Sequence, residues 1–190
     1  AGMPGICDPG EELVKISRDS GCDVICIPGP CSAITAIVSS GLPSSKFIFE
    51  GFLPKKKIDR EKTLLEISKN TKTTIIFESP HRIVKLLGEL KKYCGGSRKI
   101  KVARELTKKF EEHIGQNIDE LIEYFENKKP IGEFTILLNA IDNSKNNLFN
   151  EIELKRELHE LVDFGLSLTS ASKYLAKKNK LSKRMIYNLY

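Results

Sequence analysis

The chain has 190 residues, of which 40% are hydrophobic and 7% are aromatic. A chain of this size removes about 70% of its unfolded surface from water when it folds, so it can bury a substantial core. This composition excludes a disordered, a collagen-like and a disulfide-scaffold protein.

Positive charge is concentrated at one end of the chain. The whole sequence has 31 basic and 25 acidic side chains, a formal balance of +6. Residues 165–190 hold six Lys and Arg and no Asp or Glu, so the other 164 residues are neutral. This C-terminal segment is therefore the first candidate for contact with a polyanion.

The five cysteines, Cys7, Cys22, Cys26, Cys31 and Cys94, are odd in number and irregularly spaced. That pattern argues against a disulfide framework and against a zinc site. We expect Cys22 and Cys26, which flank a Val-Ile pair, to be reduced core thiols of a cytoplasmic protein. No apolar run is long enough to predict a membrane span.

Residues 1–44 begin with a loop rich in Gly and Pro. A helix is predicted over 11–20, with two carboxylates in its first turn, where the helix dipole favours them. The short apolar run 24–27 predicts a buried parallel strand, and a second helix is predicted over 32–40. Because a loop of the first kind normally follows a strand, we expect 1–44 to be the remainder of an N-terminal α/β domain.

Strands and helices alternate over residues 45–141, which we expect to form a second α/β domain. The predicted strands are 47–51, 73–77, 99–103 and 135–139, with a short extended piece at 113–115. The predicted helices are 59–69, 82–93 and 117–126. This alternation indicates an α/β architecture with a mostly parallel sheet.

Residues 142–150 are polar and rich in Asn, which predicts a linker. The 151–190 region then shows only helical patterns, over 152–164, 168–178 and 182–189. The expected buried side consists of Leu168, Ala171, Leu175, Leu181, Met185, Ile186 and Leu189. Since the polar side is basic, the pattern indicates a helix-turn-helix-like appendage able to lie on phosphates.

Four polar loops remain as candidates for a site, at 1–10, 28–32, 78–82 and 104–108. The common phosphate-loop, nucleophile-elbow, zinc-helix and dinucleotide motifs are absent from the sequence. In open α/β sheets, ligands bind beyond the carboxyl ends of the strands, where these loops are expected. Gly and Pro in the first two loops let backbone approach a ligand without side-chain bulk.

Six segments in this order, AGMPGICDPG, IPGPCSAITAIVSSGLP, FEGFLPKKK, ESPHR, ARELTK and GEFTILL, resemble the tetrapyrrole methylase superfamily of S-adenosylmethionine (SAM) dependent enzymes. Within it they resemble the branch that methylates a ribose 2′-hydroxyl of small-subunit (16S) ribosomal RNA, on a cytidine of the decoding region. The resemblance runs from residue 1 to about 140, and more loosely through the C-terminal helices. It implies a two-domain tetrapyrrole-methylase-like fold with an incomplete first domain, a small C-terminal helical appendage and a homodimer.

The resemblance also implies which residues surround SAM. In chain order they are Gly2, Met3, Ile6, Ser32, Ala33, Phe77, Arg104, Glu105, Gly132 and Glu133. Because the sulfonium methyl group is already electrophilic, no metal is expected. A ribose hydroxyl is a weak nucleophile that benefits from a general base, for which the loops offer Glu105, Lys108 and Glu78.

RNA contacts are predicted at three basic clusters: Lys55, Lys56, Lys57 and Arg60, then His81 and Arg82, and finally Lys183 and Arg184 in the tail. Two alternatives stay open. One is a tetrapyrrole or diphthine-type SAM methylase, against which the basic tail argues. The other is a non-enzymatic nucleic-acid-binding protein, which SAM binding would distinguish from an enzyme.

Overall fold

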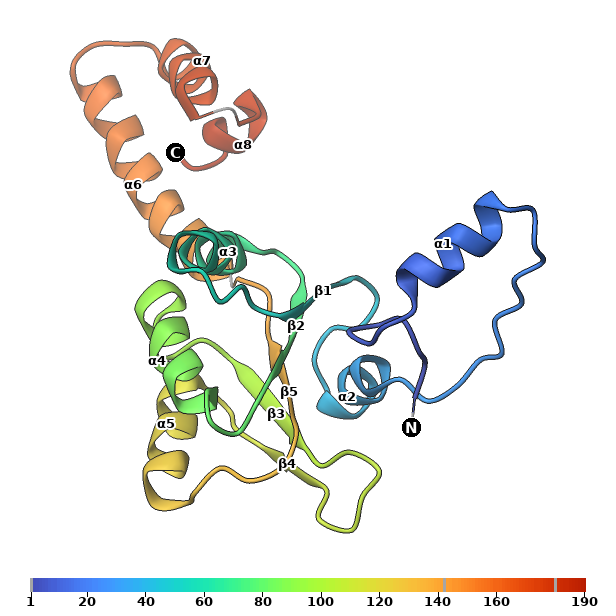
Figure 1. Ribbon diagram of the computed structural model, residues 1–190. Coiled ribbons are helices and arrows are strands. Elements are labelled where there is room, and N and C mark those ends of the chain that lie inside the picture. The colour runs from blue at the N-terminus through green and yellow to red at the C-terminus, as the bar shows by residue number, and fades with distance from the viewer. Residues whose placement is uncertain (1, 142, 180) are drawn as a thin grey trace. The chain divides into compact units, whose positions relative to one another are not determined.

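A mixed five-stranded sheet organises the first part of the computed structural model (Figure 1). The structure describes residues 2–141, 143–179 and 181–190, with side chains for all of these except 143–152. The chain divides into two units between Ile141 and Asp142. Within the first unit, we call residues 2–44 the N-terminal segment and residues 45–141 the sheet region.

The strand order is β1-β2-β5-β3-β4. The strands are β1 (Phe47–Phe52), β2 (Thr73–Glu78), β3 (Ile100–Arg104), β4 (Glu112–Ile114) and β5 (Phe134–Leu138). Every strand predicted in the sheet region is therefore confirmed. The prediction of a mostly parallel sheet is wrong. Only β1 and β2 pair in parallel, whereas the pairs β2–β5, β3–β5 and β3–β4 are antiparallel. Strands β1, β2 and β3 run in the same direction, but β5 lies between β2 and β3 and runs in the opposite direction.

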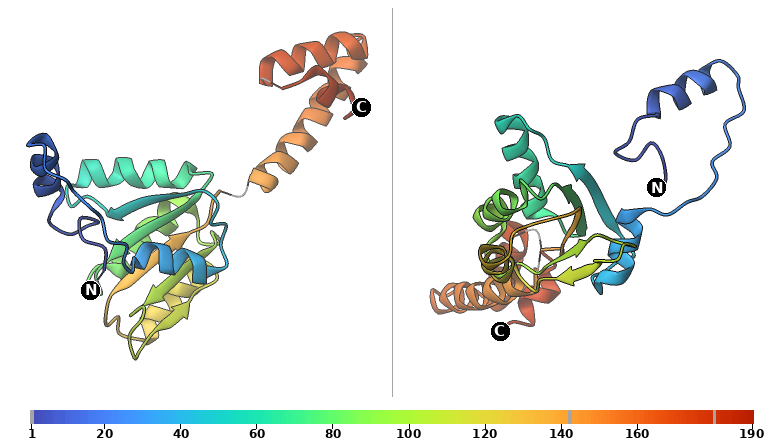
Figure 2. Two further views of the ribbon diagram at one scale, coloured as in Figure 1. Left: turned by 90° about the vertical axis from the view of Figure 1, so that its right-hand side faces the viewer. Right: turned by 60° about the horizontal axis from the view of Figure 1, so that its bottom comes forward.

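Helices cover both faces of the sheet (Figure 1; Figure 2). On one face lie α3 (Lys57–Lys69), α4 (Ile83–Cys94) and α5 (Ile118–Asn127), which bury the main core. On the other face lies α2 (Ser32–Ser40), which buries Ala33, Ala36 and Ile37 against the sheet. Removing a Leu or Ile side chain from water contributes about 1.5–3 kcal/mol, so these two apolar layers hold the region together.

The N-terminal segment differs from its prediction. Helix α1 (Glu11–Asp19) forms but buries none of its residues. The predicted strand 24–27 is not a strand, with Ile25 86% and Ile27 83% exposed, and it runs as an extended connection (Figure 1). A strand needs a neighbour to pair its backbone N–H and C=O groups, and no described strand lies beside this run. The expectation that Cys22 and Cys26 are core thiols is wrong for the same reason, since both are exposed.

The second unit is a small helical cluster. It contains α6 (Asn143–Asp163), α7 (Leu168–Asn179) and α8 (Lys183–Tyr187), whose core includes Leu158, Ala171, Leu175 and Ile186. Of the expected buried side, Leu181 and Met185 are exposed instead. Leu181 precedes α8, and the short α8 turns Ile186 rather than the adjacent Met185 toward the core.

Helix α6 also replaces the irregular linker predicted at 142–150, of which Asp142 lies outside the described residues. Residues 143–163 contain no Gly or Pro. Asn lowers helix propensity by less than about 0.7 kcal/mol per residue, so a run of Asn does not by itself stop a helix. Across the parts of the chain that the structure describes, no helix has the length and hydropathy required to cross a membrane.

Candidate functional site

The loops after β2 and β3 meet at one edge of the sheet. Glu78 at the end of β2 and Arg104 at the end of β3 both pair in register with Phe134 of β5. Since neighbouring strands lie about 4.8 Å apart, the two loops start about 10 Å from each other. The antiparallel β5 adds its own beginning, with Gly132 and Glu133, to the same edge.

The two loops of the N-terminal segment also join each other. The backbone N–H of Met3 donates a 2.8 Å hydrogen bond to the carbonyl of Pro30. A Cβ on Gly2 would lie 3.2 Å from that carbonyl oxygen, so the two backbones are in close contact. The hydrogen bond to Pro30 uses only the backbone of Met3, whose half-buried side chain lies toward the same second loop, 3.7 Å from where a Cβ on Gly29 would stand. Ile6 lies exposed in the same loop.

The first loop also reaches β1. A Cβ built on Gly51 would lie 2.8 Å from the Sγ of Cys7, and Gly51 has φ +61°. The register of β1 against β2 shifts at this point, between Phe49 and Gly51. A side chain at Gly51 would therefore both strain the backbone and push the first loop away.

Two of the expected cofactor residues share one apolar cluster beneath α2. Ala33 is buried and Phe77 is half-buried in this cluster, which also contains Ala103 and Leu137. The Phe77 ring lies edge-on to Phe49, with centroids 5.1 Å apart. This arrangement supplies a flat apolar surface next to the start of a helix.

The N-terminus of α2 is open to a ligand. Its N-cap residue, Cys31, makes no side-chain hydrogen bond to the first turn, and Ser32 begins the helix exposed. The first N–H groups of a helix lack intrahelical partners and carry the positive end of its dipole. A polar or anionic group of a cofactor would be matched by these donors.

The wall of the site on the β3 side is a hydrogen-bonded cluster. The Glu105 carboxylate accepts from the Glu133 N–H at 2.9 Å and from Lys108 Nζ at 3.1 Å. Lys108 also pairs with the Glu133 carboxylate at 3.0 Å. A Cβ on Gly132 would lie 2.7 Å from Cγ of Glu105, so Gly is required there. Next to this cluster, Arg104 donates to the Ile131 carbonyl at 2.6 Å and pairs with Glu112 at 3.0 Å.

These contacts weigh against all three candidate bases. The Glu133 N–H and Lys108 lower the pKa of Glu105, which makes its carboxylate a weaker proton acceptor. Hydrogen bonds to Glu133 and Glu105 raise the pKa of Lys108, so its ammonium keeps its proton at neutral pH. The side chain of Glu78 is 1% exposed and is paired with Arg82 at 2.7 Å. The geometry suits these groups to positioning rather than to proton transfer.

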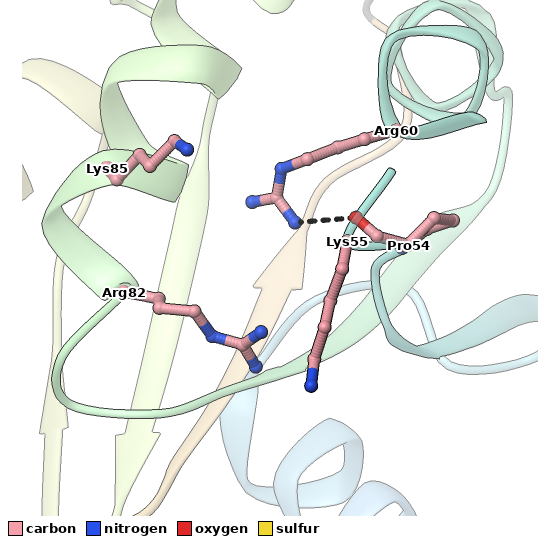
Figure 3. Close-up of a pocket in the computed structure, with 5 residues that line it drawn as sticks. All are labelled: Pro54, Lys55, Arg60, Arg82 and Lys85. Atoms are coloured by element: carbon pink, nitrogen blue, oxygen red, sulfur yellow. Dashed lines mark hydrogen bonds between the residues drawn. The ribbon is translucent and has the colours of Figure 1, made fainter. Parts of the chain in front are cut away.

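A basic pocket of about 390 Å³ lies where β1 and β2 end (Figure 3). Its lining brings together Lys55, Arg60 and Arg82, which come from both predicted basic clusters of the sheet region. Lys56, Lys57 and His81 are exposed and do not line it. Lys85 also lines the pocket and was not among the predicted RNA contacts. Its position three residues after Arg82 places both side chains on one side of a helix start, which is the signal that could have identified it.

The two predicted RNA contacts of the tail lie in the second unit. Lys183 and Arg184 form the first turn of α8 and are exposed. Ser182 caps this turn by accepting from the Met185 N–H at 3.2 Å. The two cations are therefore presented from an ordered turn.

Residues 1–122 match the family model described as Tetrapyrrole (Corrin/Porphyrin) Methylases. The chain is 39% identical over 189 residues to the ribosomal RNA small subunit methyltransferase I of Synechocystis sp., covering all of this chain and 68% of that relative. It is 41% identical over 190 residues to the protein of the same name from Vibrio cholerae, covering 98% of this chain but only 65% of that relative.

Solved structures with a similar fold include the methyltransferase CobJ, with a TM-score of 0.55, 17% identity and coverage of 74% of this chain and 62% of that one. Cobalt precorrin-4 methyltransferase CbiF gives a TM-score of 0.54 at 18% identity, covering 73% and 61%. These two likenesses establish the fold, and the relatives establish the branch. The chain belongs to the tetrapyrrole methylase family, within the group of ribosomal RNA small subunit methyltransferase I.

Proposed function

We propose that this chain provides the catalytic core of a SAM-dependent methyltransferase that acts on a ribose 2′-hydroxyl of small-subunit ribosomal RNA. A cytidine of the decoding region stays the predicted target. The observation that carries the proposal is the meeting of the β2, β3 and β5 loops at one sheet edge, where half of the expected cofactor residues lie: Phe77, Arg104, Glu105, Gly132 and Glu133. The family membership supports the reaction class. We also propose that the protein acts in the cytoplasm.

The proposed SAM site is made mainly of backbone and apolar surface. The joined loops around Met3 and Pro30 would approach the methionine part, and Ser32 would offer the open helix start. Ala33 and Phe77 supply the apolar surface. SAM, when bound, supplies an electrophilic methyl group. The task left to the protein is orientation, which can lower a barrier by about 7–11 kcal/mol.

The Glu105–Lys108–Glu133 cluster would fix the far wall of this site. Glu105 has φ +49° and Thr107 has φ +63°, so the loop between them holds backbone conformations that cost about 1–3 kcal/mol each. The ion pairs of Lys108 to both carboxylates stabilise that shape. A wall held in this way would give the ribose and the cofactor a fixed surface against which to be oriented.

We infer that the N-terminal segment belongs to an α/β domain completed by further polypeptide, and that the enzyme is a homodimer. Helix α1 leaves Leu13, Val14 and Ile16 exposed, and the run that follows it leaves Ile25 and Ile27 exposed. Five exposed aliphatic side chains in so short a segment indicate a surface that packs against something else. Sedimentation analysis of the full-length protein tests the homodimer.

Methyl transfer tests the proposed function directly. Full-length protein, labelled SAM and isolated small ribosomal subunits should give labelled ribosomal RNA, whereas free tetrapyrroles should stay unlabelled. Label in the tetrapyrroles alone would assign the chain to a small-molecule methylase. If neither substrate is labelled but the protein binds RNA, the result would support the alternative of a non-enzymatic nucleic-acid-binding protein.

The tail has its own test. The double variant Lys183→Ala/Arg184→Ala should bind RNA more weakly. The slope of the logarithm of its binding constant against the logarithm of salt concentration should also become shallower, by about one unit for each lost phosphate contact. The matched control removes Lys155 and Arg156 from the exposed side of α6, where Arg156 already pairs with Glu160. Equal salt slopes for wild type and the Lys183/Arg184 variant would remove α8 from the RNA interface.

A further inference from the structure

The basic pocket at the ends of β1 and β2 is a prearranged cluster of cations. Arg60 enters it from α3 and is 8% exposed, and its guanidinium donates to the Pro54 carbonyl at 3.4 Å (Figure 3). Arg82 and Lys85 come from the beginning of α4, and Lys55 from the loop after β1. Four cations from three separate elements thus face one cavity of about 390 Å³.

Two carboxylates hold the arginines in place without neutralising the pocket. Glu89 pairs with Arg60 at 2.7 Å, and the buried Glu78 pairs with Arg82 at 2.7 Å. Glu78 also lies 3.8 Å from Arg60, so one carboxylate links both guanidinium groups. Among the described residues, Lys55 and Lys85 have no carboxylate partner. The pocket therefore keeps two positive charges beyond those its own carboxylates balance.

We propose that this pocket binds a backbone phosphate of the RNA substrate, with Lys55 and Lys85 as its direct contacts and Arg60 and Arg82 as prearranged donors. The inference rests on the proposed function and gives it a second anchoring point. A guanidinium presents its N–H groups in a fixed fork that matches phosphate oxygens, and Lys adds a mobile point charge. The start of α4 adds the positive end of a helix dipole on the same side.

The position of the pocket separates it from the expected cofactor residues. Its arginines and Lys85 come from α3 and α4, which pack on the sheet face opposite α2. Ala33 and Phe77 belong to the cluster under α2. The pocket nevertheless opens where β1 and β2 end, which is the edge that the loops after β2 and β3 share. A polynucleotide held there by one phosphate would have its neighbouring ribose within reach of that edge.

The test compares a double variant with a single-cation control on the full chain. Lys55→Ala/Lys85→Ala removes two exposed cations that have no ion-pair partner among the described residues, and the urea unfolding midpoint checks that the fold is kept. Lys72→Ala removes an exposed cation just before β2, at the opposite end of that strand. A short fluorescein-labelled single-stranded RNA is titrated at several salt concentrations, and SAM binding is measured by calorimetry on the same samples.

In the double variant, the salt slope of RNA binding (the slope of the logarithm of the binding constant against the logarithm of salt concentration) should become shallower by about 0.7, because one phosphate contact is lost. Lys72→Ala should leave this slope unchanged. An unchanged slope in the double variant, or an equal drop in the control, overturns the proposal. So does a loss of SAM affinity with an unchanged slope, which would make the pocket a site for the cofactor carboxylate. If wild-type enzyme methylates no ribosomal RNA and the slope still falls, the proposed function fails while the phosphate site stands.

Discussion

The N-terminal segment and the sheet region contain apolar runs of the same kind but bury them to opposite extents. In the sheet region, Ile75 and Ile76 of β2 are fully buried between two layers of helices. In the N-terminal segment, Ile25 and Ile27 lie in a comparable run and are almost fully exposed. Both runs have the short, β-branched character of a strand, so local composition does not explain the difference.

The difference shows that pairing partners, and not strand propensity, turn an apolar run into a strand here. Strand β2 has β1 on one side and β5 on the other, which satisfy its backbone N–H and C=O groups. Residues 24–27 have no strand beside them among the described residues, and the Val24 carbonyl accepts from the Arg18 side chain instead of from a strand. Strand propensity measures how well a side chain fits a packed surface, so it has no effect where no such surface exists.

The largest expected effect comes from matched truncations in the two runs. Ile76→Ala should lower the free energy of unfolding by about 2–5 kcal/mol, because it leaves a cavity in a closely packed core. In the 190-residue chain by itself, Ile25→Ala should change it by less than about 0.5 kcal/mol, because there the side chain lies in water. Urea unfolding of the two variants measures both values. A loss for Ile25→Ala as large as that for Ile76→Ala would mean that the segment packs in solution.

Two glycines extend the comparison to the backbone. Gly115 has φ +92°, and a Cβ there would lie 2.7 Å from Cγ of Leu121, whereas Gly21 has φ +76° with open space around it. Gly115→Ala should cost about 2–4 kcal/mol from strain and overpacking together. Gly21→Ala should cost about 1 kcal/mol from strain alone. Equal costs, measured by urea unfolding, would show that Leu121 moves aside freely.

The sequence predicted most of the sheet region because its local signals agree with its packing. The capping pair of Asn117 and Glu120 predicted the start of α5, and the structure shows it, with the Glu120 N–H donating to Asn117 at 2.9 Å. The direction of β5 was missed, because the alternation of strands and helices does not tell where a later strand inserts. The helix over 143–150 was missed because a polar composition was taken for a loop.

For the candidate site, the sequence predicts which loops follow the strands but not how their side chains pair. Loop positions follow from strand ends, and the structure brings the ends of β2 and β3, with Glu78 and Arg104, to one edge. Their ion pairs depend on the register of β5 against β2 and β3, which no local pattern contains. Lys85 was missed because its significance comes from Lys55 and Arg60, which belong to other elements.

A smaller effect is expected on the pH dependence of stability, for which Glu112 of the sheet region is compared with Glu12 of the N-terminal segment. Glu112 accepts hydrogen bonds from Lys128 at 2.9 Å, from the Tyr124 hydroxyl at 2.7 Å and from Arg104 at 3.0 Å. These contacts, with Lys128 first, lower the pKa of Glu112 from 4.5 to about 2. Its contribution to stability is therefore complete above pH 4.5 and is lost as the pH falls toward 2.

Glu112→Gln should lower the free energy of unfolding by about 1 kcal/mol at pH 7, a value reduced from the full shift because Lys128 is half exposed. The difference from wild type should shrink between pH 4.5 and pH 2. Glu12→Gln, in the first turn of α1, is the control, since Glu12 has no ion pair among the described residues. Unfolding midpoints across this pH range measure both variants, and a constant difference for Glu112→Gln would contradict the assignment.

The smallest effect concerns the contact that joins α1 to the exposed run. Arg18 donates to the Val24 carbonyl at 2.8 Å, and this hydrogen bond is open to solvent. Water replaces such a bond at little cost, so Arg18→Ala should change the free energy of unfolding by less than about 0.5 kcal/mol. It should nevertheless speed proteolysis between α1 and α2, because this bond restrains the connection locally. A global loss of stability together with unchanged proteolysis would mean that the N-terminal segment unfolds as one unit with the sheet region.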